Sequence, residues 1–121
     1  MDSRAQEGGT RSRRGHAIGL ARVSGASMLP VLAPGDRILV RYGARVRPGD
    51  LVVATLPDGT LAVKRAVSRR PLRDGRPGWW LLSEDPTVGV DSRHRGPVGD
   101  EAVHGVVLAR LWPRPRWGRG R

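Results

Sequence analysis

The chain has 121 residues, which is enough for one domain with a hydrophobic core but not for two. It has no cysteine, so a disulfide framework, a cysteine nucleophile and a thiolate metal site are excluded. Its apolar stretches, such as residues 51–56, fall far short of the roughly 20 residues that a membrane-spanning helix needs. The polar N-terminus lacks the apolar run of a secretory signal. We therefore expect no membrane segment and a cytoplasmic location.

The net charge of +11 is concentrated at the two ends of the chain. Residues 1–22 hold five arginines and two acids, and residues 110–121 hold five arginines and no acid. We expect a disordered basic arm over residues 1–20, a folded domain over 21–112 and a basic Pro/Arg-rich tail over 113–121. Arg-rich tails can bind nucleic acid or acidic surfaces, but the few aromatic residues and the lack of a known motif argue against a nucleic-acid partner.

The pattern of the folded region is that of a mainly β domain, because short apolar segments alternate with Gly/Pro turns. Strands are predicted at residues 21–24, 37–42, 51–56, 60–68, 78–83 and 103–112. Between them, residues 27–32 predict one helical turn or a tight loop, Pro57-Asp58-Gly59 predicts a hairpin turn, and residues 84–97 predict a long irregular loop.

Lys64 stands out because it is the sole lysine among 22 basic residues. Arginine keeps its proton in proteins, whereas a lysine in apolar surroundings can become neutral and act as a general base. The neighbours of Lys64 at residues 61–63 and 66–67 are apolar. An ordinary surface lysine is the alternative interpretation.

Ser27 is the candidate nucleophile, in the segment Gly25-Ala26-Ser27-Met28-Leu29-Pro30. The small residues Gly25 and Ala26 allow a substrate backbone to approach and leave N–H groups free for an oxyanion. Met28 offers an apolar wall beside the bound peptide. A serine that serves only the turn is the alternative interpretation.

Taken together, these segments resemble the signal peptidase I family of serine proteases and, more distantly, the LexA-type self-cleaving repressors. The family's Ser-Met-x-Pro box corresponds to residues 27–30 and its Lys-Arg box to Lys64-Arg65. Its late box corresponds to Asp91-Ser92-Arg93, followed by Gly96-Pro97-Val98. The resemblance covers about residues 21–112 and implies a compact catalytic β domain with short helical turns.

The resemblance implies a Ser/Lys dyad in which Lys64 takes the proton of Ser27 and Ser27 attacks the scissile carbonyl. The Ser27 N–H would supply one oxyanion donor. Many bacterial members have a serine two positions before the nucleophile as a second donor, and here that residue is Gly25. One lost donor can cost roughly 3 kcal/mol of transition-state stabilisation.

Residues 35–50, the Lys64-Arg65 segment and the Trp79-Trp80 pair resemble the nickel-type superoxide dismutase maturation proteases of actinobacteria. This likeness implies a protein substrate, namely a dismutase precursor from which an N-terminal leader is removed. Nickel would belong to that substrate. No cofactor is expected for this chain, and the spacing of His16, His94 and His104 predicts no metal site.

Three departures from the family pattern bear on the site. Ser83-Glu84-Asp85 replaces a Gly-Asp-Asn segment and brings two carboxylates near Lys64, where a close carboxylate would oppose its neutral form. Gly89 replaces a serine that often contacts the lysine, although the dismutase-maturation group also tends to have glycine there. Asp91 and Arg93 are expected to form an ion pair that either braces the site or is merely solvated.

Two alternative functions stay open at this point. One is a general signal peptidase that lacks a membrane anchor. The other is a catalytically impaired binding module that uses its Arg-rich tails.

Overall fold

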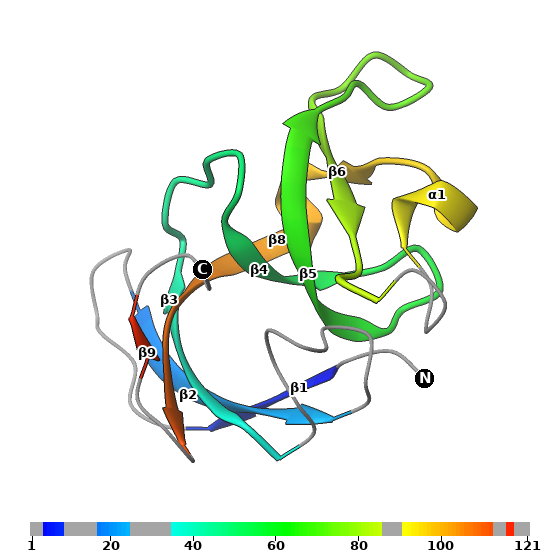
Figure 1. Ribbon diagram of the computed structural model, residues 1–121. Helices are drawn as coiled ribbons and strands as arrows, with labels where there is room; N and C mark the ends of the chain where they lie inside the picture. Colours follow the sequence, from blue (N-terminus) through cyan, green and yellow to red (C-terminus); the bar gives the residue numbers. More distant parts are fainter. Residues whose placement is uncertain (1–3, 9–16, 25–34, 86–90, 113–115, 118–121) are drawn as a thin grey trace.

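The computed structural model describes residues 4–8, 17–24, 35–85, 91–112 and 116–117. Within these ranges the strands form one antiparallel sheet, with two short helical segments beside it (Figure 1). The strands are β1 (Arg4–Gly8), β2 (Ala17–Ser24), β3 (Arg37–Tyr42), β4 (Leu51–Thr55), β5 (Leu61–Arg69), β6 (Gly78–Leu82), β7 (Val98–Gly99), β8 (Val103–Trp112) and β9 (Arg116–Trp117). The helical segments are α1 (Ser92–Arg95) and the 3₁₀ turn η1 (Asp100–Ala102).

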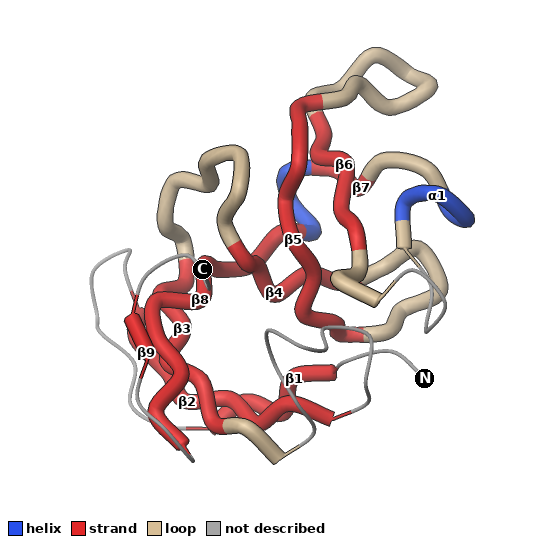
Figure 2. Tube along the Cα trace, viewed as in Figure 1, coloured by secondary structure: helices blue, strands red, loops and turns tan. Residues whose placement is uncertain are grey.

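The sheet curls upon itself. Its strand order is β1-β2-β3-β8-β4-β5-β6-β7, and β9 pairs with β8. The first strand also meets β5, where Arg4 lies opposite Ala62, so the path bends round as the tube in Figure 2 shows. The predicted mainly β domain is confirmed.

Two hydrophobic clusters lie on either side of the central strands. One contains Ala21, Val23, Ile38, Val40, Leu51, Val53, Val63 and Val107. The other contains Val52, Ala54, Leu56, Ala62, Ala66, Trp79, Leu81, Val98 and Val106. Alternate residues of β4 enter opposite clusters, because successive side chains of a strand point to opposite faces. The strand β4 is therefore buried on both faces, and its neighbour β5 contributes to both clusters.

The predicted strands agree closely with β3, β4, β5, β6 and β8, whereas the two-residue strands β7 and β9 were not predicted. The prediction for residues 37–42 coincides with β3, and the prediction for residues 103–112 coincides with β8. The hairpin turn at Pro57-Asp58-Gly59 joins β4 to β5, with Gly59 at φ +87°. This is the left-handed conformation for which glycine has no steric penalty.

The expected disordered arm over residues 1–20 does not hold for Arg4–Gly8 or for Ala17–Leu20. The first segment forms β1, and β2 begins at Ala17, four residues before the predicted start. Backbone pairing explains the difference, because β1 lies antiparallel to β2 over five residue pairs. A ladder of main-chain hydrogen bonds needs no apolar side chains, so composition did not reveal it.

Two other local elements differ from expectation. The predicted irregular loop over residues 84–97 contains α1, and Arg116–Trp117 of the expected tail forms β9 against β8. Neither helical segment within the described ranges is long or apolar enough to cross a membrane.

Candidate functional site

Lys64 lies at the centre of the fold, on β5, with no exposed surface. It pairs with Val52 of the doubly buried strand β4. Alternation along β5 places it on the same face as Ala62 and Ala66, which belong to the second hydrophobic cluster. Burial of a charged ammonium among apolar groups is costly, so a lysine at this position needs polar partners.

Ser83 provides a polar partner for Lys64. The Lys64 Nζ donates a hydrogen bond of 2.9 Å to Ser83 Oγ, and both groups are buried. The register of the hairpin explains the contact, since Arg65 of β5 pairs with Leu82 of β6. Ser83, the residue that follows the last residue of β6, therefore lies opposite Lys64.

Asp91 holds the Ser83 backbone in place. The Ser83 N–H donates to Asp91 Oδ2 at 3.0 Å. Arg93 forms an ion pair with the same carboxylate through Nη2 at 2.6 Å, and its backbone N–H donates to Asp91 Oδ1 at 3.0 Å. The expected ion pair is present, and the Asp91 side chain is 1% exposed rather than solvated.

These contacts shift the protonation of Asp91. Burial by itself would raise the pKa of this carboxyl. The hydrogen bonds from the Arg93 side chain and from the Ser83 and Arg93 N–H groups outweigh burial and lower the pKa to about 2. Asp91 is therefore a stable anion at neutral pH.

The short helix α1 fixes the position of this carboxylate. Asp91 is the N-cap of α1, and His94 Nδ1 accepts a 3.4 Å hydrogen bond from the Asp91 N–H in a capping box. Ser92 is also buried, and its Oγ accepts a 2.9 Å hydrogen bond from the N–H of Leu81. The hydrogen bonds from Leu81 to Ser92 and from Ser83 to Asp91 thus join the start of α1 to the end of β6 and to Ser83, which contacts Lys64.

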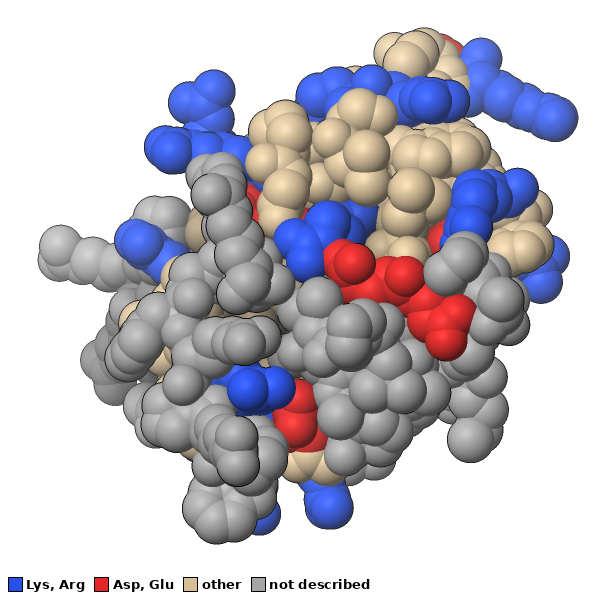
Figure 3. Space-filling view, viewed as in Figure 1, with Lys and Arg blue, Asp and Glu red and all other residues tan. Residues whose placement is uncertain are grey.

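Glu84, the first of the two carboxylates that follow Ser83, pairs with an arginine next to Lys64. Glu84 forms an ion pair with Arg65, the neighbour of Lys64, and Arg65 Nη1 also donates to the Gly49 carbonyl at 2.7 Å. Figure 3 shows acidic side chains gathered in a band over the lower ends of β5 and β6. The charge of Glu84 is thus balanced by an arginine.

The remaining candidates divide into two groups. Ser27, Gly25, Ala26 and Met28 lie outside the described residues, as does Gly89. Among the histidines, His94 caps α1, and His104 Nε2 lies 2.6 Å from Thr55 Oγ1. Within the ranges that the structure covers, no three His, Asp or Glu side chains cluster in a way that could hold a metal ion.

Sequence reasoning missed the role of Ser83. It treated the segment 83–85 only as a departure from a family pattern and considered its carboxylates. The signal that could have found Ser83 is the hairpin register, because pairing Arg65 with Leu82 places a hydroxyl opposite the sole lysine. A bulge between residues 66 and 68 of β5 makes that register hard to derive from the hairpin ends.

Comparisons with known proteins identify the family of this chain. The Peptidase S24-like family matches residues 5–107, a stretch that includes Lys64, Ser83 and Asp91. The protein named "Mitochondrial inner membrane protease subunit 1" from Schizosaccharomyces pombe (strain 972 / ATCC 24843) is similar at 28% identity over 115 residues. That alignment covers 78% of this chain and 73% of the relative. Since the family match spans most of the sequence, the chain belongs to the Peptidase S24-like family and is a peptidase of the signal-peptidase type.

Proposed function

We propose that this peptidase is a Ser/Lys endopeptidase that removes an N-terminal leader from a protein precursor. Ser27 would be the nucleophile and Lys64 the general base. The observation that carries the proposal is the fully buried Lys64 amine, held by a hydroxyl on a braced segment within the matched region. A chain that uses arginine at its other basic positions retains a deprotonatable amine here.

Acylation would begin with a proton transfer. Neutral Lys64 accepts the hydroxyl proton of Ser27 while Ser27 Oγ bonds to the scissile carbonyl carbon. The carbonyl oxygen becomes an oxyanion, to which the Ser27 N–H would donate. Lys64 then gives the proton to the leaving amine as the C–N bond breaks, which leaves an ester on Ser27.

Deacylation would reverse the roles. Lys64 accepts a proton from water while the water oxygen attacks the ester carbon. The C–O bond to Ser27 breaks, and Ser27 Oγ recovers a proton from Lys64. The substrate leaves as a carboxylic acid, so the cycle consumes one water for each peptide bond and requires no cofactor.

Ser83 would position the amine for these transfers. A neutral amine has one lone pair, and that lone pair must point at the Ser27 hydroxyl. A hydrogen bond from Nζ to Ser83 Oγ limits rotation of the amine. Asp91 and Ser92 hold the backbone N–H groups of Ser83 and Leu81. Ser83 would thus provide the contact with the lysine that family members often obtain from a serine at the position of Gly89.

We further propose a nickel-type superoxide dismutase precursor as the substrate and the cytoplasm as the place of cleavage. The likeness of residues 35–50, Lys64-Arg65 and Trp79-Trp80 to the maturation proteases supports this choice. A general signal peptidase and a binding module are the alternatives that the experiment must separate.

The test is intact-mass analysis of a nickel superoxide dismutase precursor incubated with the wild-type chain and with Ser27→Ala. We expect the wild type to release the leader and the variant to leave the precursor whole. Release of the leader by both proteins would refute Ser27 as the nucleophile. An unchanged precursor with a folded wild-type chain would refute the dismutase substrate, and failure to cleave any of a panel of leader peptides would favour the binding module.

Replacement of Ser83 by alanine is expected to lower kcat by up to roughly tenfold, because a hydrogen bond between neutral groups contributes about 0.5–1.5 kcal/mol. The KM should stay near the wild-type value, since the hydroxyl orients the base and does not bind substrate. Steady-state kinetics on a fluorogenic leader peptide would measure both constants. Ser83→Thr, which keeps the hydroxyl, is the control and should recover most of the rate. Equal losses in the two variants would contradict a positioning role.

A further inference from the structure

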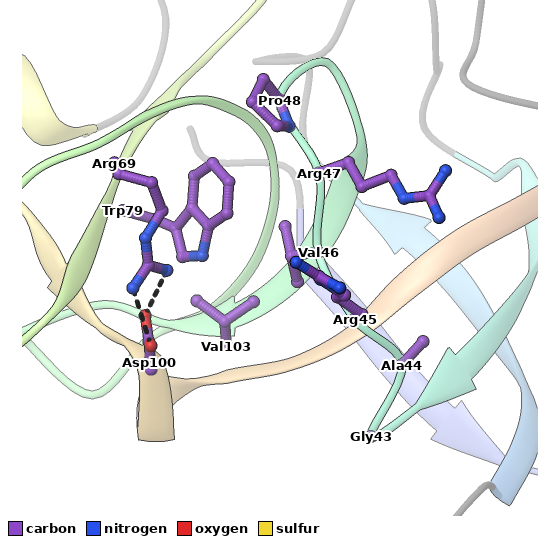
Figure 4. Close-up of a pocket in the computed structure, with 10 residues that line it drawn as sticks. All are labelled: Gly43, Ala44, Arg45, Val46, Arg47, Pro48, Arg69, Trp79, Asp100 and Val103. Atoms are coloured by element: carbon purple, nitrogen blue, oxygen red, sulfur yellow. Dashed lines mark hydrogen bonds and ion pairs between the residues drawn. The ribbon is translucent and has the colours of Figure 1, made fainter.

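A hollow lies apart from the residues around Lys64. The loop between β3 and β4 faces β6 and the start of β8 across a cavity of about 1080 Å³. Its apolar lining includes Val46 and Pro48 of the loop, Trp79 of β6 and Val103 of β8. Figure 4 shows Trp79 and Val46 on facing sides of this hollow. None of the residues that hold Lys64 lines it, so this groove is a separate feature.

The groove has a basic edge. Arg45 and Arg47 line it, and both are exposed. Among the described residues, neither guanidinium forms an ion pair with a carboxylate. The acid at the opposite edge is neutralised, since Asp100 accepts two hydrogen bonds from Arg69, at 2.7 and 2.9 Å. The positive charge of the loop side is therefore left for a ligand.

The basic edge continues into a smaller hollow of about 400 Å³. Ala44, Arg45 and Arg47 line both hollows, and the smaller one adds Arg41 of β3, the apolar Val106 and Leu108, and the buried Asp50, which accepts a hydrogen bond from the Arg47 N–H. In Figure 4 the Arg47 side chain extends away from Trp79, so the arginines follow the loop rather than converge on one point. A ligand that uses this strip must be elongated, with negative charges spaced along it.

We propose that the groove binds an extended acidic peptide segment, with one apolar side chain seated against Val46 and Pro48 and carboxylates along Arg45 and Arg47. Guanidinium groups suit carboxylates because their planar donors can bind both oxygens. The apolar lining explains why the ligand must carry an apolar residue as well as charge.

The same observations disfavour a nucleic-acid ligand. Single-stranded nucleic acid is held by bases that stack on exposed aromatic faces. Trp79 is only 4% exposed, and Arg69 lies over its ring at 4.8 Å. Its indole therefore forms part of the groove wall and has no free face for a base.

Fluorescence anisotropy with a short labelled peptide of alternating glutamate and leucine tests the proposal on the full chain carrying Ser27→Ala, which prevents cleavage. We expect saturable binding that weakens as salt is raised, because the arginines are exposed and screened. The double variant Arg45→Glu/Arg47→Glu should bind about tenfold or more weakly, since two charge contacts are lost and reversed. This binding does not depend on the proposed dyad, so the outcome is independent of the cleavage test.

The matched control is Arg37→Glu/Arg73→Glu, which changes the net charge equally at exposed arginines away from the groove. It should reduce binding far less than the groove variant. Equal losses in the two variants would overturn the proposal, because the peptide would then respond only to overall charge. Tighter binding of a single-stranded RNA, or no binding of the peptide by the folded wild type, would also overturn it.

A separate measurement tests whether an apolar side chain of the peptide occupies the groove. Val46→Ser should weaken binding of the glutamate–leucine peptide but leave a glutamate–serine peptide unaffected. Equal effects on the two peptides would show that no leucine side chain occupies the groove, and that result would overturn the assignment.

Discussion

Replacement of Lys64 by arginine is expected to lower the rate of peptide cleavage by roughly 10²–10⁴-fold, the usual contribution of a general base. Arginine keeps the positive charge but does not release its proton in proteins. It is also larger than lysine, and position 64 has no exposed surface into which the extra atoms could extend. Initial rates on a leader peptide would measure the loss.

Lys64→Met separates this chemical role from a structural one. Methionine is close to lysine in length but has neither charge nor a base, so cleavage should fall as far as in Lys64→Arg. The free energy of unfolding should stay the same or rise, since a buried amine is exchanged for an apolar group. Arg65→Lys serves as the control, because it leaves position 64 intact. Substantial cleavage by Lys64→Met would refute the proposed base.

Replacement of Asp91 by asparagine is expected to lower the free energy of unfolding at pH 7 by up to about 2 kcal/mol, as follows from the lowering of its pKa from 3.8 to about 2. The carboxylate is buried and receives hydrogen bonds from Ser83 and Arg93, so its loss weakens both the β6 end and α1. Solvent around the half-exposed Arg93 screens part of this contribution. Urea unfolding of both proteins would measure the difference.

The difference in the free energy of unfolding between the wild type and Asp91→Asn should become smaller as the pH falls. Folding lowers the Asp91 pKa, so between about pH 4 and about pH 2 the unfolded chain binds more protons than the folded one. The stabilisation by Asp91 is complete above this window and is lost as the pH falls through it. The wild type should therefore lose stability more steeply than Asp91→Asn in this range. Parallel curves for the two proteins would contradict the role of Asp91.

The strands were largely predictable because their signals are local. The segments 37–42 and 103–112 have β-branched and apolar residues between turn residues, and they coincide with β3 and β8. Asp91 and Arg93 were also foreseen as an ion pair from the late box of the resemblance. In contrast, β1 was missed because its polar residues give no apolar pattern, and its pairing with β2 depends on the chain folding back.

Ser83 shows why part of the site could not be predicted. The sequence suggested that Glu84 would act on Lys64, whereas the structure pairs Glu84 with Arg65 and turns the Ser83 hydroxyl to the amine. Which side chain of a strand end meets a given residue depends on the register with the next strand. A shift of one residue would exchange the two outcomes.

The sequence by itself determined the chemical groups available: one lysine, no cysteine, a Ser-Met-x-Pro box, a late Asp-Ser-Arg box and the strand segments that carry them. These are properties of residue type and short-range pattern. Only the tertiary structure decided that Lys64 is fully buried, that Ser83 meets it and that Asp91 is an anion braced by Arg93. Burial and cross-strand contact arise when strands distant in sequence pack together, because solvent exclusion and hydrogen-bond partners are set by neighbours in space.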